Sequence, residues 1–373
     1  KRVASSAGTG AVLSKSATVA RQNGNPLPRV HHEDNDMASY NSEGLPNSGI
    51  DYYMEEGNID EIMTEEGTSP KPYILSLSGK TLDDNVAMIQ KVVDLSATVR
   101  AKIAAIELNL ACPNIVGKPT LAYDMDQLQD VLKKVSQKFG KYYKSSSTVK
   151  MPVFGVKLPP YLDMIQLETV ANIINKYEGS LISYITTMNT MGNAMPIDVS
   201  VEQPFILANS GLAGMSGKCV NATACANVWK FRKCLAPSID IVGVGGVETG
   251  DDVIRLVLAG AKAVQIGTCH WKEGPGCFDR IAKETREWLS AHGYSSISEV
   301  YNQLKPWSKE RANQSRQLRK EAVAKEKASG NAESSMVVQP NEASMWKLIS
   351  AILLVIVAIL CADKFHGNLL PSE

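Results

Sequence analysis

The feature that most restricts the fold of this chain is a series of dense apolar runs, each about as long as a β-strand. Runs without polar alternation are typical of strands that are covered on both faces. Helix-length segments separate several of them, and alternation of strand and helix predicts a parallel sheet. The predicted strands are 11–17, 73–79, 103–111, 153–159, 181–189, 239–246 and 263–269.

The connecting segments carry the signals of amphipathic helices. Apolar residues recur at helical spacing, and polar residues stand where two of these helices would begin. Thr81 with Asp84, and Thr249 with Asp252, fit N-caps that open a helix. The segments with this periodicity are 82–93, 167–174 and 253–257.

The number of strands bears on the fold class. A (β/α)8 TIM barrel needs eight strands, whereas this chain offers seven and begins close to one. We therefore expect an α/β fold, a (β/α)8 barrel over residues 1–301 that lacks its first strand in this chain. A doubly wound open sheet is the alternative. Polar residues at the carboxyl ends of nearly all the strands favour the barrel.

Segments outside this pattern lead to further expectations. The insertions 55–71 and 140–151 are polar and are expected to be solvent loops. Residues 302–343 are interpreted as a basic helix and a linker. The apolar segment 345–363 is interpreted as a single transmembrane helix, because a bilayer core needs about 17–25 residues. A buried C-terminal helix is the alternative for this segment, and 364–373 would be a short tail.

Charge and cysteine content exclude several functions. Lys plus Arg and Asp plus Glu each number 39, so the chain lacks the positive surplus expected of a nucleic-acid-binding protein. The chain has seven cysteines and no C-x-x-C pair, which fits neither a disulfide framework nor a zinc site. No metal site is predicted, and the barrel is expected to fold in a reducing compartment.

The stretch IELNLACPN places reactive and polar groups at the end of a predicted strand. Cys112 follows the run 103–111, and Pro113 turns the chain at once. Asn109 and Asn114 would face the same pocket. A buried structural cysteine is the commoner case. A thiol with an ordinary pKa of about 8.5 can nevertheless act as a general base when a nearby cation lowers that pKa.

Other polar residues stand at comparable places. Lys15 and Lys157 lie within predicted strands, where an ammonium group is costly unless it meets an anion or a polar ligand. Asn41 belongs to a polar loop, and Asn189 with Thr190 ends another predicted strand. These residues are candidates for binding a small polar substrate.

Glycines end the last two predicted strands. Gly245, Gly246, Gly267 and Thr268 would expose backbone N–H groups at the place where barrels usually bind phosphate. The first pair is not part of a dinucleotide fingerprint, because Glu248 occupies the position of the required third glycine. Together with the preceding residues, they predict a barrel that holds a phosphorylated cofactor.

At this point the chain resembles a known family. NSEGLPN, ELNLACPNIVGKP, GVKLPPY and VGVGGVETGDD are similar to motifs of the class 1, soluble-type dihydroorotate dehydrogenases, and the likeness runs from about Ser5 to Tyr301. The resemblance implies an FMN-bearing (β/α)8 barrel, usually a homodimer, that oxidises dihydroorotate to orotate in pyrimidine biosynthesis. In the membrane-bound class the catalytic base is serine, and the matching residue here is Cys112.

The resemblance also implies roles for individual residues. Cys112 would take the C5 proton of dihydroorotate while the C6 hydride moves to the flavin. The implied substrate-binding residues are Lys15, Asn41, Gly44, Leu45, Asn109, Asn114, Asn189 and Thr190. The implied cofactor-binding residues are Lys15, Lys157, Gly214, Gly245, Gly246, Gly267 and Thr268.

Several positions depart from the family pattern. Glu43 replaces a methionine near an anionic substrate, and Ala111 replaces a serine beside the base. Residues 213–217 correspond to a glycine-rich segment of the family but contain fewer glycines, and Thr190 replaces a serine. With the expected loss of the first strand, these changes leave open an alternative, a catalytically inactive structural subunit of a mitochondrial membrane complex.

The electron acceptor and the location follow from different features. The VGKPTLAYD loop resembles the fumarate-coupled branch of the family, whereas a membrane anchor would suit a quinone. We expect dihydroorotate and orotate as partners, with fumarate or quinone as acceptor. The predicted location is the inner mitochondrial membrane, or else the cytoplasmic face of another membrane, and the predicted assembly is a homodimer or a membrane complex.

Overall fold

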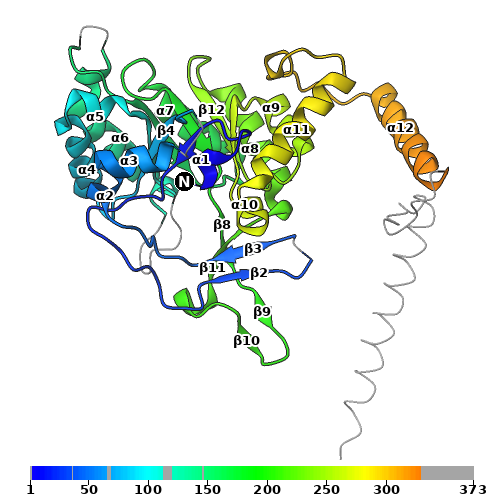
Figure 1. Cartoon of the computed structure of the whole chain (residues 1–373), viewed down its shortest axis with the longest axis horizontal. Helices are drawn as coiled ribbons and strands as arrows, with labels where there is room; N and C mark the ends of the chain where they lie inside the picture. The colour runs from blue at the N-terminus through cyan, green and yellow to red at the C-terminus, as the bar shows by residue number, and fades with distance from the viewer. Residues whose placement is uncertain (1, 36, 65–68, 112–119, 145–146, 329–373) are drawn as a thin grey trace, which may run out of the picture. The chain divides into compact units, whose positions relative to one another are not determined.

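The computed structural model describes residues 2–35, 37–64, 69–111, 120–144 and 147–328. The chain divides into two compact units, Lys1–Leu304 and Lys305–Glu373. The first unit contains all the strands among these residues, and its elements are labelled in Figure 1.

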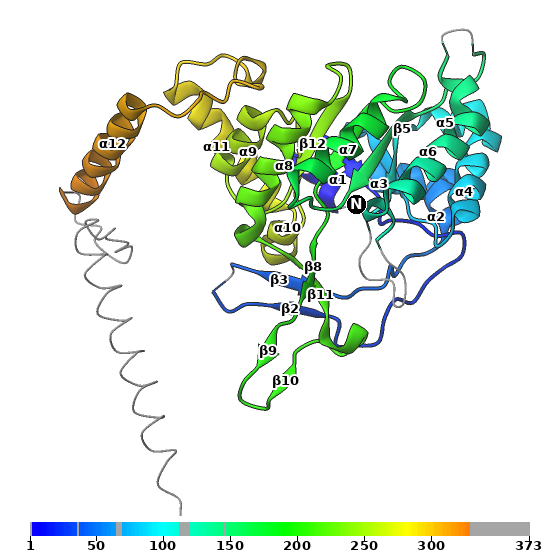
Figure 2. The ribbon, with the colours of Figure 1, turned by 180° about the vertical axis from the view of Figure 1, so that it is seen from behind.

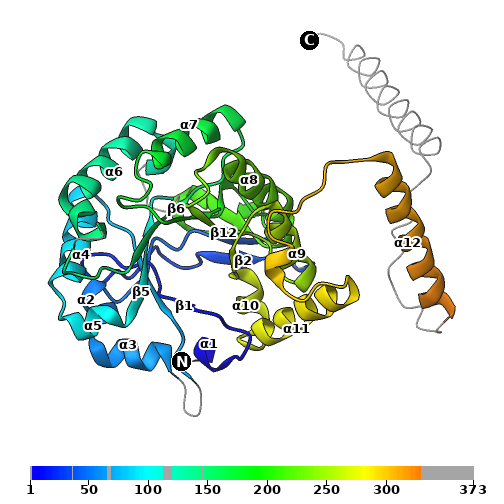
Figure 3. The ribbon, with the colours of Figure 1, turned by 90° about the horizontal axis from the view of Figure 1, so that it is seen from above.

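A seven-stranded sheet forms the centre of the first unit. Its order is β1-β4-β5-β6-β7-β12-β13, and every neighbouring pair is parallel. Seen from above, the sheet curls inside a ring of helices (Figure 3). The strands are β1 (Val12–Leu13), β4 (Tyr73–Leu77), β5 (Ile103–Asn109), β6 (Val153–Leu158), β7 (Tyr184–Thr187), β12 (Asp240–Val244) and β13 (Ala263–Gln265).

This topology distinguishes between the two predicted fold classes. The strands of the sheet follow one another in chain order, whereas a doubly wound sheet reverses its order at a switch point. The α/β class and the parallel sheet are thus confirmed, and the curled arrangement is consistent with a TIM barrel. The helices of this unit are α1 (Arg2–Ser5), α2 (Ile50–Met54), α3 (Glu56–Met63), α4 (Leu82–Asp94), α5 (Ala97–Ala101), α6 (Met125–Phe139), α7 (Met164–Asn175), α8 (Asn221–Cys234), α9 (Gly250–Ala259), α10 (Thr268–Glu273) and α11 (Gly276–Ala291).

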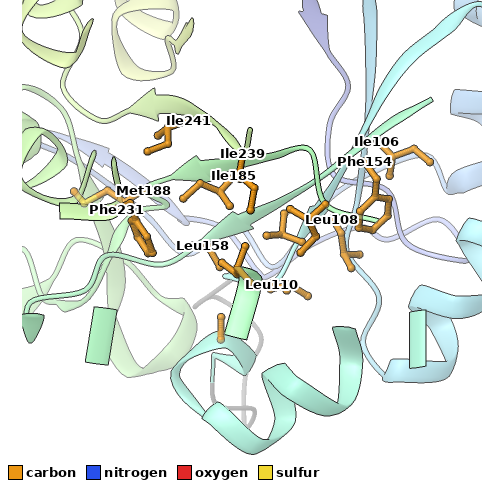
Figure 4. Packing of buried hydrophobic residues seen from close by; sticks show 14 of the residues in the cluster. Ile106, Leu108, Leu110, Phe154, Leu158, Ile185, Met188, Phe231, Ile239 and Ile241 are labelled. Carbon is orange, nitrogen blue, oxygen red and sulfur yellow. The ribbon is translucent and has the colours of Figure 1, made fainter. Parts of the chain in front are cut away.

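The alternation of side chains along β5 shows how the sheet serves both a core and a site. Ile106 and Leu108 belong to the apolar core that the sheet shares with the helices (Figure 4). Glu107 and Asn109 alternate with them and therefore point to the opposite face of the sheet, inside the curl. Burial of the apolar set stabilises the fold by about 25 cal/mol per Å² removed from water.

The two predicted N-caps are confirmed. Thr81 precedes α4 and accepts a hydrogen bond from the backbone N–H of Asp84, whose side chain accepts in return from the backbone N–H of Thr81. Thr249 and Asp252 form the same reciprocal pair at the start of α9. Each cap satisfies N–H groups that a helix leaves unpaired and contributes about 1 kcal/mol.

A second, antiparallel sheet was not predicted. It has the order β2-β3-β11-β8, and a hairpin of β9 and β10 accompanies it (Figures 1 and 2). Its strands are short and partly exposed, so they lack the long apolar runs on which the predicted strands depend. The strands are β2 (Val30–His32), β3 (Ser39–Asn41), β8 (Met191–Ala194), β9 (Ile197–Asp198), β10 (Gln203–Pro204) and β11 (Ala213–Ser216).

Two predicted segments differ in the structure. The expected loop 55–71 contains α3, because Ile59 is fully buried and anchors one face of that helix in the core. The expected strand 263–269 ends at Gln265, and α10 begins at Thr268. Short 3-10 turns are η1 (Leu121–Tyr123), η2 (Gly140–Tyr143), η3 (Ala208–Gly211), η4 (Lys218–Val220) and η5 (Ile297–Glu299).

In the second unit the structure describes one long helix, α12 (Lys309–Ala328). It lies within the segment that was interpreted as a basic helix. Nearly all its described side chains are exposed, so it presents no face to a core of its own.

Candidate active site

A cavity of about 310 Å³ lies at the carboxyl ends of the parallel strands. Asn109 ends β5, Gln265 ends β13, and Lys157 stands next to the last residue of β6. Because parallel strands deliver their carboxyl ends to one rim, residues far apart in the chain meet there. The predicted site residues that line the cavity are Lys15, Asn41, Gly44, Leu45, Asn109, Lys157, Asn189, Thr190, Gly245, Gly246, Gly267 and Thr268.

Three predicted residues are not found in the cavity lining. Cys112 and Asn114 lie outside the described residues, so their predicted roles remain predictions. Gly214 is described, but it lies within β11, paired with Asn41 across the antiparallel sheet. The cavity instead meets the end of this strand, at Ser216 and the following glycine.

A network of amides forms one side of the cavity. Asn109 Nδ2 donates to Ser16 Oγ at 3.2 Å, and Asn189 Nδ2 donates to Asn109 Oδ1 at 3.2 Å. Asn189 Oδ1 accepts from the backbone N–H of Thr190 at 2.8 Å. These bonds fix which end of each amide faces the cavity.

Thr190 adds a binding group to this amide side. Its Oγ1 is buried and makes no hydrogen bond within the described residues. A buried hydroxyl without a partner costs free energy. A polar ligand in the cavity would satisfy it.

Two lysines make the cavity suitable for anions. Lys15 follows β1, and Lys157 lies in β6, where the strand register pairs it with Asn109. Lys157 Nζ donates to Gln265 Oε1 at 3.4 Å. Ammonium groups in a partly buried cavity stabilise a negatively charged ligand more strongly than they would in water.

Glycines form the rim where β12 ends. Gly246 has a φ of 65°, and a Cβ there would lie 2.7 Å from the carbonyl oxygen of Gly217. Gly245 has a φ of 134°, and a Cβ there would lie 2.9 Å from Ala224 Cβ. Only glycine therefore fits at these positions, and the backbone can approach a ligand closely. This rim suits a phosphate group.

The two acidic groups in the cavity lining are each paired with a cation. Glu43 Oε2 lies 3.4 Å from Arg29 Nε, and both side chains are 19% exposed. Glu248 Oε1 lies 3.2 Å from Lys272 Nζ. This pairing reduces the repulsion that either carboxylate would exert on an anionic ligand.

Sequence reasoning missed several lining residues. Ser14 and Ser16 flank Lys15, and Met188 and Trp271 also line the cavity. Gln265 could have been predicted, because a polar side chain within an apolar strand is as unexpected as Lys15 and Lys157 are. Trp271 lies on α10, where nothing in the sequence distinguishes it from a surface residue.

These observations define a class of protein. A curled parallel sheet, an amide-rich cavity with two lysines and a glycine rim are typical of (β/α) barrels that bind polar, anionic ligands at the carboxyl ends of their strands. Small-molecule sites on such barrels carry chemistry on the loops that follow the strands.

Comparison with known proteins identifies one family within that class. The profile of the family described as dihydroorotate dehydrogenase matches residues 2–289. Dihydroorotate dehydrogenase A (fumarate) of Lactococcus lactis subsp. cremoris is 38% identical over 296 residues, which cover 79% of this chain and 88% of that protein. The chain belongs to the dihydroorotate dehydrogenase family and is an oxidoreductase.

Two further comparisons agree with this assignment. Dihydroorotate dehydrogenase (fumarate) of Trypanosoma cruzi is 37% identical over 305 residues, covering 82% of this chain and 89% of that protein. A solved structure of DHODH from Eimeria tenella in complex with ferulenol has a TM-score of 0.62 at 22% identity, covering 79% of each chain. The likeness to the Eimeria tenella structure supports the fold alone, because the sequence identity is low. The interpretation of the chain as an enzyme is confirmed by these relatives, which are named dihydroorotate dehydrogenases.

The predicted membrane location needs correction. The expected transmembrane segment 345–363 lies outside the described residues, and no helix in the described part of the chain is both long and apolar enough to cross a bilayer. The relatives named above carry the fumarate designation, and one of them is from Lactococcus. The prediction of a mitochondrial or other membrane location is therefore wrong.

Proposed function

We propose that the chain oxidises dihydroorotate to orotate with bound FMN and passes the electrons to fumarate. The observation that carries the proposal is the convergence of amides, lysines and a glycine rim on one cavity. Family membership and the fumarate designation of the relatives support the choice of substrate and acceptor.

The residues at the rim fit a flavin mononucleotide. Gly245 and Gly246 form a cradle that a Cβ would fill, and Gly267 with Thr268 lines the same cavity. Their backbone N–H groups would bind the phosphate, and Lys157 would face the flavin ring. When bound, FMN supplies an acceptor for a hydride.

The remaining residues would bind the substrate and move a proton. Asn109 and Asn189 present fixed amide donors and acceptors to the amide edges of dihydroorotate, and Lys15 would neutralise its carboxylate. Cys112 Sγ would take the proton from C5, a role that rests on the family resemblance. Such positioning contributes to the rate because it replaces the random encounter of reacting groups.

The proposed assembly is a homodimer that uses the β9–β10 hairpin. Large apolar side chains are exposed on and beside it: Ile197 is 55% exposed, Val199 86%, Val201 57% and Leu207 60%. A cluster of exposed apolar residues is typical of a protein interface. Light scattering of the wild-type chain and of Val199→Asp tests this: a dimer that the variant converts to a monomer supports the hairpin surface, and equal masses contradict it.

The first experiment is an anaerobic absorbance spectrum before and after addition of L-dihydroorotate. A flavin band that bleaches on addition, and that returns with fumarate but not with a quinone, supports the proposal. Cys112→Ala should retain the band and lose the bleaching. Cys219→Ala is the matched control, because Cys219 is an exposed thiol. Absence of a flavin band in protein supplied with FMN would contradict the proposed cofactor.

A further inference from the structure

The carboxyl group of Glu107 is buried inside the curled sheet. Glu107 has no exposed surface, and within the described residues it makes no ion pair. Its Oε2 accepts from Thr186 Oγ1 at 2.6 Å and from Gln265 Nε2 at 2.7 Å. Its Oε1 is buried and has no hydrogen-bond partner among the residues that the structure describes.

This arrangement is costly for stability alone. Transfer of a carboxylate from water into a protein interior costs several kcal/mol, and hydrogen bonds from neutral groups recover only part of that. A neutral apolar side chain would avoid this cost, although it could not accept from Thr186 or Gln265. A carboxyl group buried at position 107 therefore suggests a role beyond packing.

The hydrogen bonds continue from Glu107 to the cavity. Because Gln265 Nε2 donates to the carboxylate, its Oε1 must point the other way, where it accepts from Lys157 Nζ at 3.4 Å. Neighbouring strands place Lys157 level with Asn109, two residues beyond Glu107 on β5. An amide offers a donor at one end and an acceptor at the other, so its orientation decides which end the lysine meets.

We propose that Glu107 is a positioning residue, which acts through Gln265 to hold the Lys157 ammonium group in the cavity for an anionic ligand. The inference rests on the proposed function, because the ligand it concerns is FMN. A glutamine at position 107 can present its NH2 group instead of an oxygen, and Gln265 would then turn its Oε1 toward residue 107 and its NH2 group toward Lys157. Two donors would then face each other, and the ammonium group would move away.

The test is the binding of FMN to the full chain stripped of flavin, followed by flavin fluorescence. Glu107→Gln should weaken FMN binding about ten- to a hundredfold, the effect of one hydrogen bond to a charged group. Thr186→Val is the matched control, because it removes the other bond to the same oxygen and retains the carboxyl group of Glu107. The affinity of Thr186→Val for FMN should stay within about threefold of that of the wild type.

A double-mutant cycle separates positioning from general damage. In a Lys157→Met background, Glu107→Gln should cost less than about threefold, because the lysine that it positions is absent. Gln265→Leu removes the link between Glu107 and Lys157 while retaining the carboxyl group, so its loss of FMN affinity should match that of Glu107→Gln. If Glu107→Gln shows no cooperative thermal unfolding, and is therefore not folded, the Gln265→Leu variant is used in its place.

The outcomes distinguish this inference from the proposed function. Wild-type affinity in Glu107→Gln, or an equal loss in the wild-type and Lys157→Met backgrounds, would overturn the positioning role alone. Absence of FMN binding by the wild type would overturn both. A large loss that disappears in the Lys157→Met background supports the proposal.

Discussion

The stability of the loop that follows β12 should depend on Asp252. Its side chain is fully buried, and both carboxylate oxygens accept from Lys218 Nζ at 2.5 Å. It also accepts from Arg255 and from the backbone N–H groups of Glu248 and Thr249, at 3.1 and 3.0 Å. One carboxylate therefore joins η4, α9 and the loop that leads from the glycine rim.

The substitution Asp252→Asn should lower the free energy of unfolding by about 2–3 kcal/mol. Removal of one partner from a fully buried ion pair costs about 3–5 kcal/mol. The value is smaller here because Lys218 is 30% exposed and Arg255 is 50% exposed, so both can regain water. The amide oxygen of asparagine can also still accept from the backbone.

The assay is urea unfolding at pH 7, with Asp251→Asn as the matched control. Asp251 is 61% exposed and lies 3.8 Å from Arg255, so its loss should cost less than about 0.5 kcal/mol. Equal effects of the two substitutions would refute the argument from burial.

The pH dependence gives an independent check on the same residue. Burial by itself raises the pKa of Asp252, but hydrogen bonds from Lys218, Glu248 and Thr249 outweigh it and hold that pKa below its usual range. The ionised form therefore stabilises the fold above the unfolded pKa of about 3.9, and this contribution is lost as the pH falls through the lower folded pKa. The difference in the free energy of unfolding between the wild type and Asp252→Asn should therefore become smaller below about pH 4. A difference that does not change with pH would show that the charge of Asp252 does not cause the stabilisation.

Three further predictions concern other parts of the chain. Gly155→Ala should lower the free energy of unfolding by about 1–3 kcal/mol, because the new Cβ would lie 2.4 Å from the Tyr184 ring; an unchanged urea midpoint would contradict this. Arg29→Ala should raise KM for dihydroorotate about three- to tenfold by leaving the Glu43 carboxylate unpaired in the cavity, and Arg29→Ala with Glu43→Met should restore it; a double variant as weak as the single one would refute the pairing. Burial raises the pKa of Cys269 to about 12, so its thiol should resist iodoacetamide at pH 8 until the chain unfolds, and mass spectrometry that finds it alkylated in the native protein would contradict this.

Short-range patterns determined the parallel sheet and the beginnings of its helices. All seven predicted strands are present in the parallel sheet, because a strand buried on both faces must be almost wholly apolar. Thr81 and Thr249 marked helix starts for an equally local reason, since an N-cap bonds within the same turn. The antiparallel sheet was not predicted because its strands are short and lack apolar runs, and because β3 pairs with β11 from a distant part of the chain.

The candidate site was predictable in part for the same reason. Lys15, Lys157 and Asn109 stood out because charged or amide side chains are unexpected within apolar strands, and they do line one cavity. Their roles toward substrate and cofactor remain predictions that the experiments above test.

Only the tertiary structure showed how these residues act on one another. Nothing in the sequence connects Glu107 with Gln265, which are separated by 158 positions, or Arg29 with Glu43, which lines the cavity. The sequence alone does not show whether an acidic side chain is buried or exposed. Its burial and the orientation of the amide beside it depend on which strands the curled sheet brings together, and this neighbourhood exists only after the chain has folded.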